Sequence, residues 1–129
     1  MAVTSEYLKK DKVILFEPAI AFGNLLVRVD VLIKNGNTFQ LIEVKAKSVD
    51  SSDLDFETKN GIKASIKPYV EDVAFQAYVL KNAFPGATVT SYLLMPDKSK
   101  RATFDQMNQF FKVKRVGRNT EVIAHNLPE

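Results

Sequence analysis

The feature that most constrains how this chain can fold is a pair of alternating apolar segments joined by Asn35-Gly36. Residues 25–33 and 38–46 are rich in β-branched and other apolar residues, and an Asn-Gly dipeptide between two such segments is a strong signal for a β-hairpin. Asp30 lies in the first segment and Glu43 in the second, among side chains that otherwise favour burial. Burying a charge costs several kcal/mol unless a partner compensates it. The hairpin therefore predicts that something compensates these carboxylates.

Further strands and helices are expected on both sides of this hairpin. Residues 13–22 predict a strand that joins the hairpin through the turn Gly23-Asn24, so that three strands form an antiparallel meander. The polar stretch 48–67 predicts a long loop. Pro68 is a typical helix start, and an apolar stripe indicates a helix that ends near Asn82. The other expected elements are a short helix from Ser5, a strand over 88–94, a helix that begins at the capping box 103–106, and a last strand over 119–125.

The expected fold class is α/β, with a central mixed sheet, made of the meander and a further strand, flanked by helices. A chain of 129 residues is expected to form a single domain over 1–129. Cysteine is absent, which excludes disulfides, thiolate metal sites and a cysteine nucleophile. The sequence has neither an apolar run long enough to span a membrane nor a signal-peptide pattern, so a cytoplasmic protein without a membrane partner is expected. The net charge of +3 favours polyanionic partners only slightly.

Turn geometry gives an expected register for the acidic residues. If Asn35-Gly36 forms a two-residue loop, Asp30 and Glu43 become diagonal neighbours on one face, about 7 Å apart at their Cα atoms. Lys45 lies two residues after Glu43 and shares that face. The same reasoning at the preceding turn places Glu17 opposite Asp30, unless a bulge shifts the register. Three carboxylates and a lysine are therefore expected to converge.

These side chains suit a divalent metal ion and a phosphate. Carboxylate oxygens select Mg²⁺ or Mn²⁺, which keep several of their waters when bound. Such a metal polarises a phosphate and lowers the pKa of a bound water. Lys45 would then orient or deprotonate that water, or stabilise the charge that develops on the phosphate. The residues alone thus predict metal-dependent hydrolysis of phosphodiester bonds.

The pattern of Asp30, twelve intervening residues and then Glu43-Val44-Lys45 resembles the PD-(D/E)xK nuclease superfamily. The expected order of a short helix, three strands, a helix and a strand is similar to the core of that superfamily, which implies a restriction-endonuclease-like fold. The resemblance implies that Asp30 and Glu43 bind the metal together with the Val44 carbonyl, and Glu17 is the candidate for a further acid. Lys45 is then the catalytic lysine.

A finer likeness is to RecB-type and lambda-exonuclease-like nuclease domains. These carry a glutamine, followed four residues later by a tyrosine, on the helix after the site. Here Gln76 is present, Leu80 stands at the position of the tyrosine, and Tyr78 is expected in the core. The likeness implies that Gln76 assists catalysis on the substrate side, and that Asp72, one helical turn earlier, also reaches the metal site or the DNA.

The expected function is hydrolysis of DNA, with exonuclease action as the favoured mode and RNA as an open second substrate. The first alternative is a catalytically inactive nuclease-fold module that binds nucleic acid or serves as a subunit of a larger complex. The second is an unrelated binding domain in which Glu43 and Lys45 form a surface ion pair. Basic clusters over 98–101 and 112–118 are as consistent with a solvated surface as with a phosphate-binding track. His125, the only histidine, is not expected to form a metal site.

Overall fold

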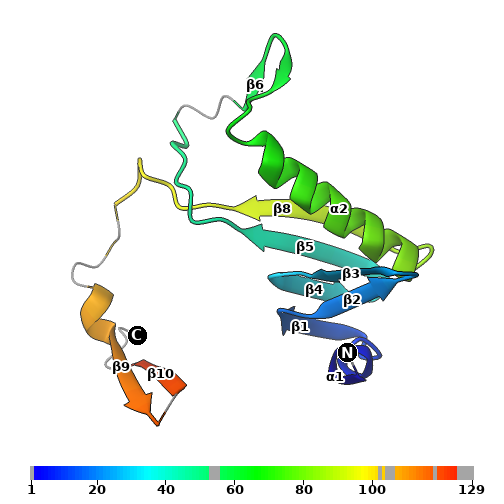
Figure 1. Cartoon of the computed structure of the whole chain (residues 1–129), viewed down its shortest axis with the longest axis horizontal. Coiled ribbons are helices and arrows are strands. Elements are labelled where there is room, and N and C mark those ends of the chain that lie inside the picture. Colours follow the sequence, from blue (N-terminus) through cyan, green and yellow to red (C-terminus); the bar gives the residue numbers. More distant parts are fainter. Residues whose placement is uncertain (1, 53–55, 102, 104–106, 118, 125–129) are drawn as a thin grey trace. The chain divides into compact units, whose positions relative to one another are not determined.

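The computed structural model describes the chain except for residues 1, 53–55, 102, 104–106, 118 and 125–129 (Figure 1). It divides into two compact units, Met1–Ser99 and Lys100–Glu129, and each is described by itself. The first unit contains a four-stranded sheet, a long helix and two two-stranded ribbons. The second contains one ribbon preceded by a 3-10 helix.

The first unit is built on a mixed sheet with the strand order β1-β4-β5-β8. Strands β1, β4 and β5 are antiparallel neighbours, whereas β8 runs parallel to β5 and is reached through the helix α2. This mixed sheet and its helix confirm the expected α/β class. The elements of the unit are α1 (Ala2–Tyr7), β1 (Lys12–Phe16), β2 (Ala19–Phe22), β3 (Leu25–Arg28), β4 (Val31–Asn35), β5 (Thr38–Val44), β6 (Glu57–Thr58), β7 (Gly61–Ile62), α2 (Lys67–Ala83) and β8 (Thr88–Leu94).

Two of the expected strands are each divided in the structure. The segment 13–22 forms parts of β1 and β2, and the segment 25–33 forms β3 and the first part of β4, so the prediction of a continuous meander was wrong. The break lies at Glu17, whose φ of 51° is in the left-handed region, which a residue with a side chain rarely adopts. The Glu17 N–H still donates to the Asp30 carbonyl at 2.9 Å. The break between β1 and β2 therefore lies directly opposite the break between β3 and β4. Strands β2 and β3 consequently pair with each other in a separate ribbon.

The two hairpin turns differ in how well they were predicted. The turn Gly23-Asn24 has the predicted register. At the second turn, Asn35 pairs with Thr38, so the loop is Gly36-Asn37 and the predicted loop Asn35-Gly36 was wrong. Gly36 has a φ of 57°, which a type II′ turn requires at its first central position. Each residue of β4 therefore lies opposite a residue two positions further along β5 than expected.

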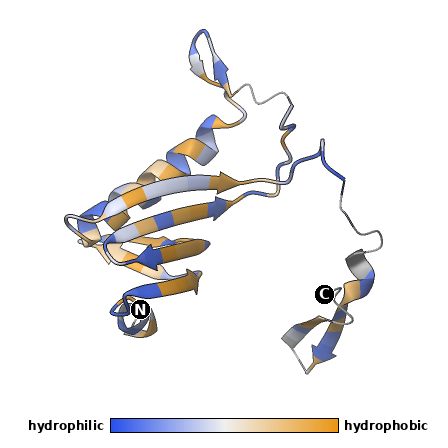
Figure 2. Ribbon diagram, turned by 180° about the vertical axis from the view of Figure 1, so that it is seen from behind, coloured by the Kyte–Doolittle hydropathy of each residue, from blue (hydrophilic) through white to orange (hydrophobic). Residues whose placement is uncertain are grey.

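Helix α2 was predicted over Pro68 to about Asn82 and is confirmed at Lys67–Ala83. It lies along one face of the sheet and contacts β8 and the β2–β3 ribbon (Figure 1). The proline in its first turn has a backbone φ already suited to a helix start. Buried and more exposed residues alternate along β5, and Figure 2 shows hydrophobic and hydrophilic residues following one another in the strands beside α2. The buried residues of the sheet pack with those of α2. The buried core consists of Ile20, Val27, Val29, Leu32, Phe39, Leu41, Val73, Val79 and Leu80.

The predicted loop 48–67 contains structure of its own. Strands β6 and β7 form a short hairpin, and the segment then continues into α2. Before the hairpin, Val49 forms a β-bridge with Asp97, just after β8. The described parts of this segment are therefore connected to the carboxyl end of β8 and to the start of α2.

The second unit contains the 3-10 helix η1 (Met107–Phe110) and the antiparallel strands β9 (Phe111–Val116) and β10 (Asn119–Ala124). The predicted last strand is confirmed as β10. Its partner β9 was missed, because Phe111 was assigned to the expected helix and residues 112–118 were interpreted as a basic cluster. Phe111, expected on a helix, lies in a strand. Residues 104–106 of the expected capping box and His125 lie outside the described residues. Among the helices that the structure describes, none is long and apolar enough to cross a membrane.

Candidate metal and phosphate site

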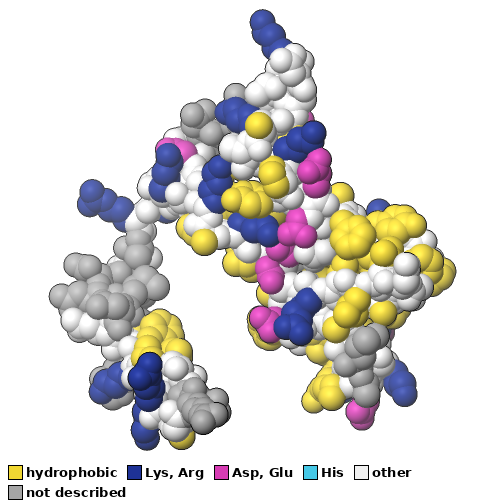
Figure 3. Space-filling model, viewed as in Figure 1, with side chains coloured by type: hydrophobic (Ala, Val, Ile, Leu, Met, Phe, Trp, Pro, Cys, Tyr) yellow, Lys and Arg dark blue, Asp and Glu magenta, His cyan; other side chains and the backbone are white. Residues whose placement is uncertain are grey.

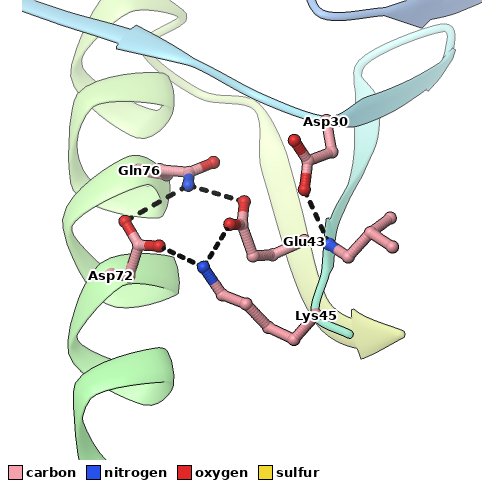
Figure 4. Close-up of polar contacts among 6 residues, drawn as sticks. Asp30, Glu43, Lys45, Asp72 and Gln76 are labelled. Carbon is pink, nitrogen blue, oxygen red and sulfur yellow. Dashed lines mark hydrogen bonds and ion pairs between the residues drawn. The ribbon is translucent and has the colours of Figure 1, made fainter. Parts of the chain in front are cut away.

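Glu43 is a buried carboxylate near the carboxyl end of β5, with only 6% of its surface exposed. The alternation of β5 places Phe39, Leu41 and Glu43 on the buried side of the strand. Both carboxylate oxygens have donors: Lys45 Nζ lies 2.7 Å from Oε1, and Gln76 Nε2 lies 2.7 Å from Oε2 (Figure 4). These two donors compensate the cost of burying the charge.

Lys45 connects the end of β5 to helix α2. Its Nζ lies 2.8 Å from Asp72 Oδ2, in addition to its contact with Glu43, and 5.4 Å from the centre of the Tyr69 ring. The hydrogen bonds to Asp72 and Glu43 raise the pKa of Lys45 well above its ordinary value. The hydrogen bond from Lys45 lowers the pKa of Asp72. Lys45 is therefore an ammonium group throughout the neutral pH range.

Asp30 lies at the break between β3 and β4. If the register of β4 and β5 is continued by one residue, Asp30 stands directly opposite Glu43, closer than the diagonal placement that was predicted. Its Oδ2 accepts a hydrogen bond from the Val44 N–H at 2.7 Å. At this break the alternation slips by one residue, because Val29 and Leu32 are both fully buried. The backbone of β5 thus holds the Asp30 carboxylate beside the strand end that carries Glu43.

Glu17 lies opposite Asp30 in the backbone register, as predicted, but its side chain does not join the network. The Glu17 side chain is 71% exposed, and its carboxylate lies 4.0 Å from the Arg28 guanidinium. The left-handed backbone at Glu17 changes the direction of its side chain from that of a regular strand residue. The expected convergence of Glu17 with Glu43 and Lys45 is therefore not found, and this arrangement gives no support to its role as a metal ligand.

The third carboxylate of the network is Asp72. Its proximity to the site was expected from the resemblance, but it was not counted among the functional residues. The available signal was its spacing of one helical turn before Gln76, which the structure places in the buried side of α2. Tyr69, which lies next to the Lys45 ammonium, was missed altogether. Tyr78 was expected in the core, and this was wrong because 54% of its surface is exposed.

Gln76 is a buried amide with one unpaired atom. Its Nε2 faces two acceptors, Glu43 Oε2 at 2.7 Å and Asp72 Oδ1 at 3.5 Å, which fixes the orientation of the amide. Its Oε1 is consequently buried without a hydrogen-bond partner in the described structure. Figure 4 shows this oxygen turned away from Asp72, toward the side of the site on which Asp30 lies. A buried acceptor without a partner is uncommon, and a donor or a cation that binds there when the site is occupied would explain it.

The charges of the network do not balance. Asp30, Glu43 and Asp72 carry three negative charges, and Lys45 supplies one positive charge, which leaves an excess of two negative charges. The available ligand atoms are oxygens, which Mg²⁺ and Mn²⁺ prefer. This excess charge and the unpaired Gln76 oxygen fit a divalent cation.

The positions of these side chains show which oxygens a divalent cation would use and which contact would have to change for it to bind. Within the described residues, no group of three or more Asp, Glu or His side chains stands close enough together to hold a metal. Asp30 and Glu43 would hold the ion together with Gln76 Oε1, and the Val44 carbonyl stays a prediction. Because Lys45 occupies Glu43 Oε1, binding through that oxygen requires the ammonium to shift toward Asp72. The oxygens are thus of the kind that Mg²⁺ or Mn²⁺ prefers, but in the described residues they are not gathered around one position, and Asp72 is the second anchor for the lysine.

Comparisons with models of known protein families, with curated proteins and with solved structures gave no match to this chain.

Proposed function

We propose that this chain is a nuclease with a restriction-endonuclease-like core that hydrolyses DNA with the help of Mg²⁺ or Mn²⁺. The observation that carries the proposal is the network at the end of β5, in which the buried Glu43 is bound by Lys45 and Gln76. Asp30 is held beside this strand end by the Val44 N–H. The order of β1, β4, β5, α2 and β8, with β8 parallel to β5, supports the same assignment.

The side chains of the site have separate roles in this proposal. Asp30, Glu43 and Gln76 provide oxygens for the cation, which when bound would polarise the phosphate and lower the pKa of a water molecule. Lys45 binds the phosphate and stabilises its developing charge. Asp72 retains the ammonium near the site when Glu43 Oε1 is engaged elsewhere.

The charge of Lys45 favours some of the three roles that the sequence left open, which are to orient a water, to deprotonate it and to stabilise charge on the phosphate. Because its hydrogen bonds to Asp72 and Glu43 raise its pKa, Lys45 carries a proton at neutral pH. A protonated lysine donates hydrogen bonds but does not take a proton from water. We therefore assign Lys45 to positioning water and stabilising charge rather than to general base catalysis.

The first test is cleavage of linear and circular DNA, single- and double-stranded, in Mg²⁺ or Mn²⁺. We expect Lys45→Ala to lose at least about 100-fold in rate, as is typical when a charge-stabilising donor is removed. The matched control is Lys81→Ala, which alters an exposed lysine in the last turn of α2 and should leave cleavage at the normal rate. Thermal unfolding of both variants checks that they are folded. Survival of circular DNA would indicate an exonuclease.

Two results would contradict the proposal. One is equal cleavage by Lys45→Ala and the unmodified chain, which would show that the activity does not belong to this site. The other is the absence of cleavage with every substrate and metal. Retained DNA binding in that case would favour the non-cleaving nuclease-fold module instead.

A further inference from the structure

A mostly apolar pocket of about 400 Å³ lies beside the candidate site, at the amino-terminal end of α2. The β6–β7 hairpin and the residue before it contribute Phe56, Glu57 and Ile62, α2 contributes Val70, and the end of β8 contributes Leu93 and Met95. Among the lining residues that the structure describes, Glu57 is the only charged one. Its volume is within the range of small-molecule sites, and the catalytic roles proposed above do not use it.

The pocket and the site share the same strand ends and the same helix. Leu93 is the register partner of Glu43 across β5 and β8, and the Lys45 N–H donates to the Leu94 carbonyl at 3.0 Å. On the helix, Val70 follows Tyr69, whose ring lies beside the Lys45 ammonium. Figure 3 shows hydrophobic side chains over this end of α2, with Lys and Arg side chains beside them and Asp and Glu side chains further along. A phosphate at Lys45 would thus have the pocket next to it.

The lining decides which part of a nucleotide this pocket can take. The Glu57 carboxylate disfavours a phosphate, and the apolar walls favour a flat uncharged ring. Phe56 supplies an aromatic ring, the kind of group on which unpaired bases stack. A carboxylate accepts a hydrogen bond from the amino group of cytosine, which thymine lacks. A nucleobase that carries an amino group is therefore the matching ligand.

We propose that this pocket holds the base of the nucleotide next to the phosphate that is attacked. The proposal rests on the proposed function and specifies its substrate class. A base can enter such a pocket only after it has left the helical stack, which costs least when the strand is unpaired. The preferred substrate is then single-stranded DNA, or a frayed duplex end, with a cytosine, adenine or guanine rather than a thymine next to the scissile bond.

The test measures binding without cleavage, by fluorescence anisotropy of the full chain in the presence of EDTA. The probes are fluorescently labelled single strands of cytosine, of thymine and of abasic deoxyribose phosphate. We expect the cytosine strand to bind about tenfold tighter than the abasic strand, since stacking of bases contributes on this scale. Ile62→Trp, which fills the pocket, should remove this difference. Ile14→Trp on β1, 58% exposed and outside the pocket, is the matched control and should retain it.

A second variant keeps the test decisive if Ile62→Trp lowers the thermal stability. Glu57→Ala alters an exposed side chain, and we expect it to reduce the preference for cytosine over thymine severalfold. Equal binding of cytosine and abasic strands by the unmodified chain would contradict the proposal that the pocket binds a base, even if the chain cleaves DNA. Base-dependent binding that Ile62→Trp abolishes, in a chain that never cleaves, would keep the base site and reject the nuclease.

Discussion

At the scale of single residues, the site depends on one ammonium that two carboxylates share. Glu43 has 8% of its side chain exposed and Asp72 has 43%, so the two contacts of Lys45 differ in what their loss would cost. Removing Lys45 leaves a buried carboxylate with one donor fewer, whereas removing the Asp72 charge leaves Lys45 paired with Glu43. A substitution at Asp72 therefore removes the partly exposed Lys45–Asp72 ion pair and keeps the buried Lys45–Glu43 pair.

We predict that Asp72→Asn lowers the free energy of unfolding by up to about 1 kcal/mol at neutral pH, because its pair is partly exposed. The Lys45 hydrogen bond lowers the Asp72 pKa, so this stability is present above the ordinary carboxyl pKa near 4 and is lost as the pH falls further. At alkaline pH the same stability is lost only when Lys45 loses its proton, and the raised Lys45 pKa places this loss above about pH 10. Urea unfolding between pH 3 and pH 10 measures the free energy of unfolding of the unmodified chain and of Asp72→Asn. The difference between the two should be constant in the middle of this range and should shrink toward acid.

The adjacent acid provides the control for this measurement. Glu71 lies on α2 next to Asp72, has 66% of its side chain exposed and stands 3.7 Å from Lys67. Glu71→Gln should change stability by only a few tenths of a kcal/mol. If both variants gave the same pH profile, the stability would come from the general charge of the helix and not from the Lys45 network.

At the scale of elements, the sequence predicted long and strongly periodic segments better than their junctions. Helix α2 and β8 have the expected bounds, since their patterns extend over many residues. A bulge near Glu17 was allowed for, because Pro18 follows it, but the positive φ was not predicted, because a glutamate seldom adopts one. The turn at Gly36-Asn37 depends on tertiary contacts, in which the Asn37 carbonyl accepts from the Thr88 N–H and its side chain donates to the Gly86 carbonyl.

The candidate site shows the same division. Asp30, Glu43 and Lys45 were placed together by turn geometry and strand alternation, and because the register error was two positions, an even number, they stayed on one face. Asp72 belongs to a different element, and its contact with Lys45 depends on how α2 packs on the sheet. Glu17 was lost to the site by the conformation of its own backbone. Sequence patterns thus predicted the site residues that belong to one hairpin, whereas the positions of Asp72 and Glu17 depend on helix packing and on backbone conformation.

We predict that Asp97→Ala loosens the segment that forms one wall of the pocket. Asp97 Oδ1 accepts hydrogen bonds from the Ser51 N–H at 3.2 Å and from the Ser99 N–H at 3.0 Å, which joins residues near Val49 to the end of β8. Hydrogen exchange at neutral pH should become faster at the Ser51 and Ser99 amides, which both lose their acceptor. Since bonds from Ser51 and Ser99 lower the Asp97 pKa, the link contributes its full stability above about pH 4, and this contribution is lost as the pH falls further.

A neighbouring aspartate tests whether this effect is specific. Asp50 accepts its hydrogen bonds from Ser52 within the same turn and does not join the segment to β8. Asp50→Ala should leave exchange at the Ser99 amide unchanged. Faster exchange there in both variants would show that local turn structure, and not the Asp97 link, holds the segment.

At the scale of the whole molecule, the positive charge is unevenly distributed along the chain. Residues 1–99 contain twelve Lys and Arg and twelve Asp and Glu, so they have no net charge. Residues 100–129 contain six Lys and Arg and three Asp and Glu, and they account for the entire net charge of +3. The unit that holds the candidate site is therefore neutral, and the unit with the β9–β10 ribbon is basic.

This division predicts that sequence-independent attraction to DNA belongs to the second unit. We expect the triple variant Lys112→Gln, Lys114→Gln and Arg115→Gln to weaken DNA binding and to flatten its salt dependence, because each lost phosphate contact lowers the slope of log K against log salt by about 0.9. Cleavage at saturating DNA should stay unchanged, since none of these residues belongs to the network around Glu43. The control variant, Lys9→Gln, Lys12→Gln and Lys81→Gln, removes the same charge from exposed positions of the first unit. If both variants flattened the salt dependence equally, the net charge of the chain would be responsible, and the basic ribbon would have no special part in holding DNA.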